Sequence, residues 1–213
     1  MGLHPLASEA SAALLVVDQQ YDFEPGGALP VPNGHEIAAP IAELMNQFQT
    51  VVVTQDSHPK GHISFASSYK NKKPFDILKL ADVEAKKIDS IFDREILVRY
   101  LKSVPEQQQV LWPDHCVVGT SGWKINSKLP IEKAQLILQK GKRVDCDSYS
   151  AFFENDGTST GLANWFRAKN IQKILVVGLA GDFCVAWSAK DAEREGFEVV
   201  MDKNLTRFIY SSA

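Results

Sequence analysis

Lys173–Val177 reads KILVV and is followed at once by Gly178–Cys184, which reads GLAGDFC. A short apolar run rich in branched residues is typical of a strand that is buried on both faces. The apolar spacing of the next stretch, Val185–Glu195, predicts a helix that Gly196 ends. This strand–turn–helix unit decides the fold class, because strands that alternate with helices along a chain form parallel sheets.

The same alternation runs through the rest of the chain. Further apolar runs predict strands at Ala12–Val17, Thr50–Thr54, Gln135–Leu138 and Glu198–Met201. Apolar residues at helical spacing predict helices at Glu36–Phe48, despite Pro40, and at Gly161–Ala168. We therefore expect an α/β fold, with a doubly wound, mostly parallel sheet and helices on both of its faces.

One segment, 67–109, interrupts this alternation and is rich in Lys, Asp, Glu and Gln. We expect it to form a helical insertion in a single domain that spans 1–213, since 213 residues suffice for one domain with a sizeable core. A solvated surface excursion is the simplest interpretation of the insertion. A lid and a contact between copies of the chain are the alternatives.

Charge and composition exclude several functions. A formal net charge of -3 does not provide the basic surface that nucleic acids require. The longest apolar runs, 12–17 and 174–180, are far shorter than the roughly 20 residues that span a bilayer, so we expect no membrane partner. The chain has no basic residue before its first apolar run, and its cysteines are odd in number without a C-x-x-C pair. These features predict a cytoplasmic protein with free thiols.

Reactive side chains follow four of the predicted strands. Asp18 follows the first strand, Asp56 and His58 follow the second, Lys140 follows the third, and Cys184 follows the fourth. The carboxyl ends of parallel strands meet at one edge of the sheet, where ligand sites form. We therefore expect a carboxylate, a carboxylate–histidine pair, an ammonium group and a thiol to converge there.

Cys184 is the candidate nucleophile, because the N-terminus of a helix lowers the pKa of a thiol and offers N–H groups to an oxyanion. Lys140 would favour the thiolate, and Asp18 would accept the thiol proton and pass it to a leaving amine. The alternative readings are an inert buried thiol at Cys184, a strand-end Asp18 and a solvated Lys140.

Asp56-x-His58 is a candidate metal site, because residues two apart on an extended segment point the same way. His115 is the candidate third ligand, and His62 is either a further ligand or a support for the others. One carboxylate and two imidazoles suit a divalent ion such as Zn²⁺, Fe²⁺ or Mn²⁺. The alternative is that these loop histidines cap backbone groups.

Aromatic residues stand beside these polar positions. Phe23, Trp112 and Tyr149 would wall a flat ring, although aromatic residues are more often part of a core. Cys116, beside His115, could serve as a soft metal ligand, but we favour a packed thiol there. Cys146 has no partner in the sequence, and we interpret it as structural.

Together these motifs resemble the nicotinamidase/pyrazinamidase branch of the isochorismatase-like cysteine hydrolases. The matching motifs extend from about residue 13 to 202 and are VDQQYDF (17–23), QDSHP (55–59), HISFA (62–66), WPDHCVVGT (112–120), KG (140–141), DSYSAF (147–152) and GLAGDFCV (178–185). Each motif is modest alone, but their joint presence in this order is specific.

The resemblance implies a metal-dependent cysteine amidohydrolase of NAD salvage. Such an enzyme converts nicotinamide, and pyrazinamide-like analogues, to the acid and ammonia through a thioester. It implies a catalytic triad of Asp18, Lys140 and Cys184, with the N–H groups of Ala180 and Cys184 as oxyanion donors and a cis peptide at Leu179–Ala180. It also implies ring-binding roles for Phe23, Trp112 and Tyr149, and a metal site formed by Asp56, His58 and His115.

Some features depart from the family pattern. Gly181 stands where relatives more often carry Thr or Ser, which predicts a looser turn, and the insertion is longer than in compact members.

Vinyl-ether hydrolysis, carbamoyl-amide hydrolysis, and a non-catalytic metal- or redox-responsive role are the rival functions. The sequence leaves open the metal, the role of His62, a homo-oligomeric state, the role of the insertion and the breadth of amide specificity.

Overall fold

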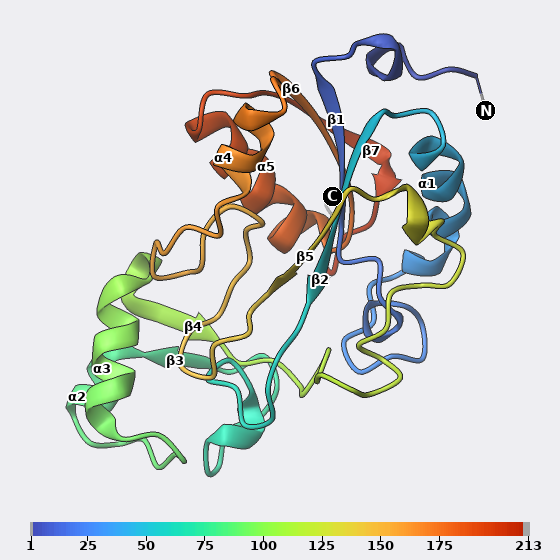
Figure 1. Ribbon diagram of the computed structural model, residues 1–213. Helices are drawn as coiled ribbons and strands as arrows, with labels where there is room; N and C mark the ends of the chain where they lie inside the picture. The colour runs from blue at the N-terminus through green and yellow to red at the C-terminus, as the bar shows by residue number, and fades with distance from the viewer. Residues whose placement is uncertain (1, 211–213) are drawn as a thin grey trace.

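A five-stranded sheet forms the centre of the structure, a computed structural model that describes residues 2–210 (Figure 1). In spatial order its strands are β5 (Leu136–Lys140), β2 (Thr50–Asp56), β1 (Ala12–Val17), β6 (Lys173–Gly178) and β7 (Glu198–Thr206). Every pairing in this sheet is parallel, so the predicted α/β class is confirmed. The ends of the predicted 1–213 domain, residues 1 and 211–213, lie outside the described residues.

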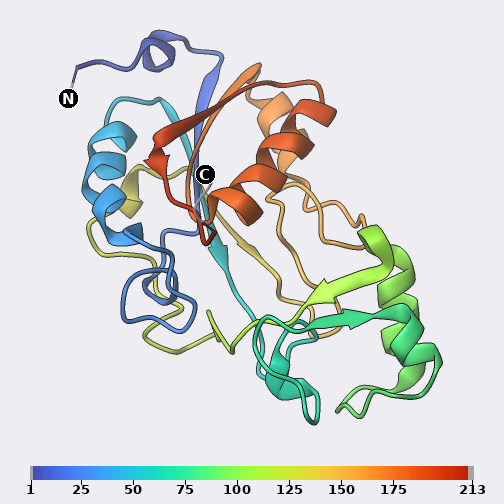
Figure 2. The ribbon, with the colours of Figure 1, turned by 180° about the vertical axis from the view of Figure 1, so that it is seen from behind.

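Helices cover both faces of the sheet, as expected (Figures 1 and 2). Helix α1 (Ala38–Met45) packs on one face, and α4 (Leu162–Ala168) and α5 (Ala186–Arg194) pack on the other. Successive side chains of a strand point to opposite faces. Leu14 and Val16 of β1 accordingly join the α1 core, whereas Leu15 and Val17 join the core under α4 and α5.

Short helical turns complete the described elements. The 3₁₀ turns are Pro5–Ser8, Tyr21–Phe23, Gly34–Ile37, Ala66–Ser68, Pro105–Gln107 and Ile131–Lys133, and a π-helical turn, Gly181–Val185, leads into α5. The helix predicted at 36–48 is therefore a 3₁₀ turn followed by α1. No helix within residues 2–210 combines the length and the apolar character needed to cross a bilayer.

The edge strands differ from the sequence-based expectation. Ile137 of β5 and Val200 of β7 are 42% and 41% exposed, so complete burial on both faces applies only to the three central strands. Strand β2 continues to Asp56 and β5 to Lys140, because the parallel ladder pairs these two polar residues with each other. Apolar patterning alone could not place polar residues inside strands.

The 67–109 insertion contains the predicted helices and a ribbon that was not predicted. Its described elements are β3 (Ile77–Lys79), α2 (Leu80–Glu84), α3 (Arg94–Ser103) and β4 (Gln108–Val110), with β3 and β4 antiparallel. Such short strands carry too little sequence pattern to be recognised. Leu78, Leu97 and Leu101 form part of a separate core, so the insertion is packed and not merely a solvated excursion.

Candidate active site

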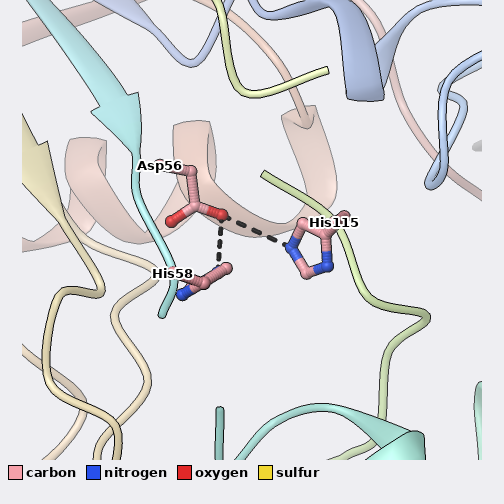
Figure 3. A group of neighbouring side chains, drawn as sticks. All are labelled: Asp56, His58 and His115. Carbon is pink, nitrogen blue, oxygen red and sulfur yellow. Dashed lines mark ion pairs between the residues drawn. The ribbon is translucent and has the colours of Figure 1, made fainter. Parts of the chain in front are cut away.

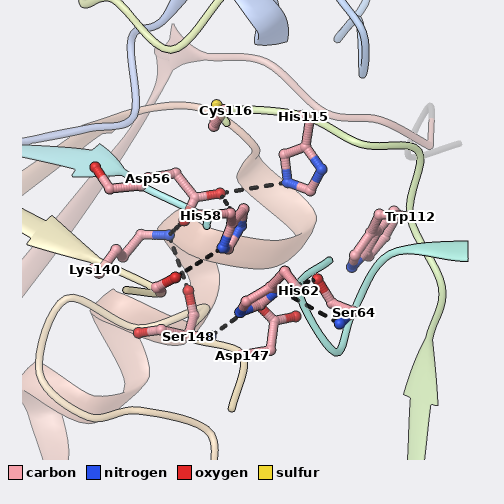
Figure 4. Close-up of polar contacts among 12 residues, drawn as sticks. Asp56, His58, His62, Ser64, Trp112, His115, Cys116, Lys140, Asp147 and Ser148 are labelled. Carbon is pink, nitrogen blue, oxygen red and sulfur yellow. Dashed lines mark hydrogen bonds and ion pairs between the residues drawn. The ribbon is translucent and has the colours of Figure 1, made fainter. Parts of the chain in front are cut away.

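The carboxyl ends of the strands bring Asp18, Lys140 and Cys184 together. Lys140 Nζ lies 2.9 Å from Asp18 Oδ2 and 3.5 Å from Cys184 Sγ. The strand register explains this arrangement, because Lys140 lies opposite Asp56 on β2, and Asp18 follows Val17, which lies opposite Gly178 on β6. Groups from segments far apart in sequence thus meet within contact distance (Figure 4 shows Lys140 beside Asp56).

Lys140 is the electrostatic centre of the site. Its side chain is fully buried, and Nζ also contacts Asp56 Oδ1 at 3.1 Å and the Ser148 carbonyl oxygen at 2.9 Å. Burial alone would lower the pKa of Lys140, but the carboxylates of Asp18 and Asp56 outweigh it and raise that pKa well above its usual value. The ammonium group therefore stays charged and neutralises two buried carboxylates.

The Cys184 thiol is buried in the same place. Burial raises the pKa of Cys184 well above its usual value, and this outweighs the opposing effect of Lys140. The thiol therefore keeps its proton in this structure, and a role for Cys184 as a nucleophile would require a base. Thr54 Oγ1 donates a hydrogen bond to Asp18 Oδ1 at 2.6 Å. Asp18 Oδ2 is ion-paired with Lys140 at 2.9 Å, and the Asp18 carboxylate also lies close enough to Cys184 to raise the pKa of the thiol.

Asp56, His58 and His115 form a compact donor set (Figure 3). The Nε2 atoms of His58 and His115 lie 2.9 Å and 3.4 Å from Asp56 Oδ2. Burial would raise the pKa of Asp56, but the neighbouring His58 and Lys140 hold it well below its usual value, which keeps the carboxylate ionised. One ionised carboxylate and two imidazoles are a donor set that binds divalent metals.

The hydrogen bonds made by the Nδ1 atoms of the two histidines fit a metal site. Nδ1 of His58 lies 2.9 Å from the Gly141 carbonyl oxygen, and Nδ1 of His115 lies 2.8 Å from the Pro113 carbonyl oxygen. A carbonyl only accepts, so each Nδ1 carries a proton and each Nε2 is left as the ligand atom. Gly141 has φ +67, and a Cβ there would lie 2.5 Å from His58 Cε1, so glycine lets this backbone approach the ring.

His62 supports this set from behind in the present structure. Its Nδ1 pairs with Ser64 Oγ at 2.8 Å (Figure 4). Its Nε2 lies 3.1 Å from the Cys146 carbonyl oxygen. Its ring packs on that of His58, with 4.1 Å between centroids. Burial lowers the pKa of His62 well below its usual value, so the ring is neutral. His58, His62 and Asp147 also form a second group close enough to share an ion.

A narrow cavity lies above the thiol, and the three predicted ring-binding residues all line it. The lining residues are Phe23, Leu29, Asp56, Trp112, His115, Asp147, Ser148, Tyr149, Ala180, Phe183, Cys184 and Ile209. Trp112 Nε1 donates a hydrogen bond to the Tyr149 hydroxyl at 3.1 Å, which fixes two of the rings.

The peptide bond between Leu179 and Ala180 is cis, as the resemblance implied. Cys116 and Cys146 are buried free thiols.

Sequence reasoning missed Phe183 and Ile209 as part of this cavity. Phe183 packs edge-on against Trp112, with 4.9 Å between centroids, and its position beside Cys184 could have revealed it. Ile209 lies in the segment after β7, and no sequence pattern connects that segment to the site. Its backbone N–H and that of Tyr210 donate to the Asp182 carboxylate at 3.1 and 2.8 Å. These two hydrogen bonds to Asp182 hold the segment after β7 against the turn that carries Cys184.

The turn at Gly181 is tighter than the sequence predicts. The Gly181 N–H donates to the Arg207 carbonyl at 2.7 Å, and a Cβ at Gly181 would lie 2.5 Å from Phe208 Cε1. The expected looser turn is therefore wrong, because the ring of Phe208 fills the space that a Thr or Ser side chain would need.

Gly181→Ala is expected to destabilise the protein by about 1–3 kcal/mol, the usual effect of overpacking. Urea unfolding monitored by circular dichroism measures this change. In a Phe208→Ala background the same substitution should cost less, since the clashing ring is absent and only the close approach to Thr206 Cγ2 at 2.7 Å remains. An equal cost in both backgrounds would contradict the steric explanation.

Comparison with known proteins assigns the class. The isochorismatase domain model matches residues 12–209, so the chain belongs to the isochorismatase family. It is 42% identical over 195 residues to a nicotinamidase of Acinetobacter baylyi, covering 90% of this chain and 80% of that protein. The family match and the nicotinamidase relative together show that the chain is an amidohydrolase.

Two solved structures extend the comparison. A nicotinamidase/pyrazinamidase of Acinetobacter baumanii superposes with a TM-score of 0.82 at 37% identity, covering 96% of this chain and 88% of that one. A pyrazinamidase of Pyrococcus horikoshii in complex with zinc superposes with a TM-score of 0.68 at 31% identity, covering 94% and 88%.

Proposed function

We propose that this protein hydrolyses nicotinamide to nicotinate and ammonia through a thioester on Cys184. One observation carries the proposal: Lys140 Nζ contacts both Asp18 and Cys184 beside a cavity walled by aromatic rings. The similarity to nicotinamidases supports nicotinamide as the substrate. Pyrazinamide-like amides, which share the flat ring and the carboxamide, are proposed as further substrates.

The reaction begins when the Cys184 sulfur attacks the amide carbon and its proton passes to Asp18. The N–H groups of Ala180 and Cys184 hold the oxygen that becomes negatively charged. Asp18 then gives its proton to the leaving nitrogen, the C–N bond breaks, and ammonia departs from the thioester. Asp18 next takes a proton from a water molecule, whose oxygen attacks the thioester carbon. The C–S bond then breaks, the proton on Asp18 returns to the sulfur, and nicotinic acid leaves and loses its proton to solvent as nicotinate. Lys140 stays charged throughout and stabilises the thiolate.

The cavity walls position the substrate ring. Phe23, Trp112 and Tyr149 offer flat apolar surface for a pyridine, and Phe183 adds a fourth ring that packs on Trp112. Holding the carboxamide above Cys184 makes the attack effectively unimolecular, which favours it by several kcal/mol.

Asp56, His58 and His115 would hold one divalent ion, and the contacts of both Nδ1 atoms with backbone carbonyls support this assignment. When bound, the ion supplies a Lewis-acid contact for the substrate. Zinc is the metal in the Pyrococcus relative, and the donor set also suits Fe²⁺ and Mn²⁺. We further propose that the enzyme acts in NAD salvage in the cytoplasm, in agreement with its three free cysteines.

Removal of the metal should lower ammonia release from nicotinamide by about 100-fold, which corresponds to losing about 3 kcal/mol of substrate orientation. A coupled ammonia assay with chelator-treated protein, before and after addition of Zn²⁺, Fe²⁺ or Mn²⁺, measures this effect. Full activity after chelation would remove the metal from the mechanism. Untreated protein that releases no ammonia from nicotinamide would contradict the proposed substrate itself.

A further inference from the structure

A second, larger cavity lies on the other side of Tyr149 and Phe183 from the candidate active site. It encloses about 600 Å³, the size of a typical small-molecule site, and lies between the end of α3, strand β4, the loop at 149–157 and helix α5. The loop after β5 runs between α5 and the insertion in both overall views (Figures 1 and 2). The proposed hydrolysis does not use this outer cavity.

Two carboxylates of the outer cavity lack partners. Asp191 is only 9% exposed, and its side chain makes no hydrogen bond or ion pair with any residue within 2–210. Glu154 Oε2 is shielded from solvent and accepts no hydrogen bond from the described residues. Burying such an oxygen without a donor is costly, so both positions favour a ligand that brings positive charge or N–H groups. Burial raises the pKa of Glu154 to about 7, in agreement with this lack of partners.

The other charged groups of the cavity leave it negative. Asp156 is already neutralised by Arg143, whose Nη1 lies 2.6 Å from its carboxylate, and Glu106 accepts a hydrogen bond from Gln108. Among the described residues that line the cavity, the one basic side chain is Arg194, whose guanidinium carbon lies 5.4 Å from the centroid of the Phe153 ring. Glu106, Glu154 and Asp191 therefore remain without an ion pair among the described residues, against the single guanidinium of Arg194.

Aromatic rings form one wall of the outer cavity. Tyr149 lies between Phe183 and Trp187, with centroid distances of 5.7 and 6.1 Å. All three rings line the cavity. Lys190 Nζ lies 5.5 Å from the Trp187 ring, so this indole already holds one cation against its surface. Aromatic faces beside carboxylates are the combination that recognises flat organic cations.

We propose that the outer cavity binds a planar aromatic cation of the N-alkylpyridinium class. The ring would stack on the wall formed by Tyr149, Phe183 and Trp187, and its positive charge would lie against Asp191 and Glu154. A pyridinium has a permanent charge and needs no hydrogen-bond donor from the protein, which matches a cavity whose unpartnered groups are acceptors. The proposal concerns equilibrium binding to the resting protein and stands independently of the proposed hydrolysis.

Isothermal titration calorimetry with N-methylpyridinium tests this proposal, because the probe has no amide to hydrolyse. We expect binding that weakens about tenfold in Asp191→Asn, in Glu154→Gln and in Trp187→Ala. Trp187→Phe should keep most of the affinity, since it retains a ring. Glu193→Gln, on the same helix but outside the cavity, is the matched control and should bind like the wild type. Benzyl alcohol, a neutral ring of similar size, should bind at least tenfold more weakly.

Several results would overturn the proposal. They are an absence of heat at millimolar probe, equal affinity for benzyl alcohol, and affinity that the three cavity variants leave unchanged. Loss of binding in Phe23→Ala but not in Asp191→Asn would move the cation to the inner cavity and contradict the assignment. Circular dichroism identifies any variant that fails to fold, and the remaining cavity variants then decide.

Discussion

Cys184→Ala is expected to lower the turnover of nicotinamide by about 10⁴-fold or more, the scale seen when a catalytic nucleophile is removed. The thiol lies 3.5 Å from Lys140 Nζ and lines the ring cavity, so its loss removes the only sulfur of the described site that faces the substrate position. A coupled ammonia assay measures the effect. The fold should persist, because the substitution removes one buried atom and no hydrogen-bonded backbone group.

Cys146→Ala is the matched control for this variant. Cys146 is also a fully buried free thiol, but it belongs to the core of the insertion and not to the cavity lining. Its replacement should leave turnover within about threefold of the wild type. The Cys146 side chain does not line the cavity, and Ala keeps the backbone carbonyl that His62 contacts. Appreciable turnover in Cys184→Ala would refute the nucleophile.

Lys140→Met is expected to abolish ammonia release and also to destabilise the fold by about 3–5 kcal/mol, the usual cost of leaving buried charges unpaired. Lys140 lies between Asp18 and Asp56, all with side chains that are almost completely buried. Removing the ammonium leaves the buried Asp18 carboxylate without a counter-charge beside the carboxylate of Asp56. Urea unfolding and the ammonia assay measure the two effects on the same preparation.

Two controls separate the electrostatic role of Lys140 from simple packing. Lys173→Met removes a lysine that also contacts two carboxylates, those of Glu9 and Glu198, but at the surface, and it should change stability far less. The double variant Asp18→Asn, Lys140→Met should regain part of the lost stability, because one of the two buried charges is gone, while activity stays absent. Equal destabilisation in the single and double variants would contradict the charge argument.

The sequence predicted the central sheet because its three inner strands are continuous apolar runs. It also predicted that Asp18, Asp56, Lys140 and Cys184 gather at one edge, which follows from parallel topology. Their roles in catalysis and metal binding remain predictions. The sequence could not show that Asp56 and Lys140 are paired within the ladder, since register depends on contacts between strands and not on local pattern.

Features that depend on contacts between residues far apart in sequence could not be predicted from the sequence. The ribbon β3–β4 is too short to give a periodic signal, yet Gln109 on β4 donates to Asp147 and to the Tyr149 hydroxyl, both at 3.0 Å. Ile209 reaches the cavity only because Asp182 fastens the segment after β7. Gly181 appeared to loosen the turn, because nothing local reveals that Phe208 packs against it.

The central claim is that Cys184 carries the acyl group during turnover, and mass spectrometry of acid-quenched protein tests it most directly. Protein mixed with excess nicotinamide and quenched during steady-state turnover should contain a nicotinoyl adduct on the peptide that includes Cys184. The adduct should be absent when nicotinate replaces the amide and when Cys184→Ala is used. Continued ammonia release with no adduct on that peptide, in a protein whose Cys184→Ala variant is equally active, would contradict the account.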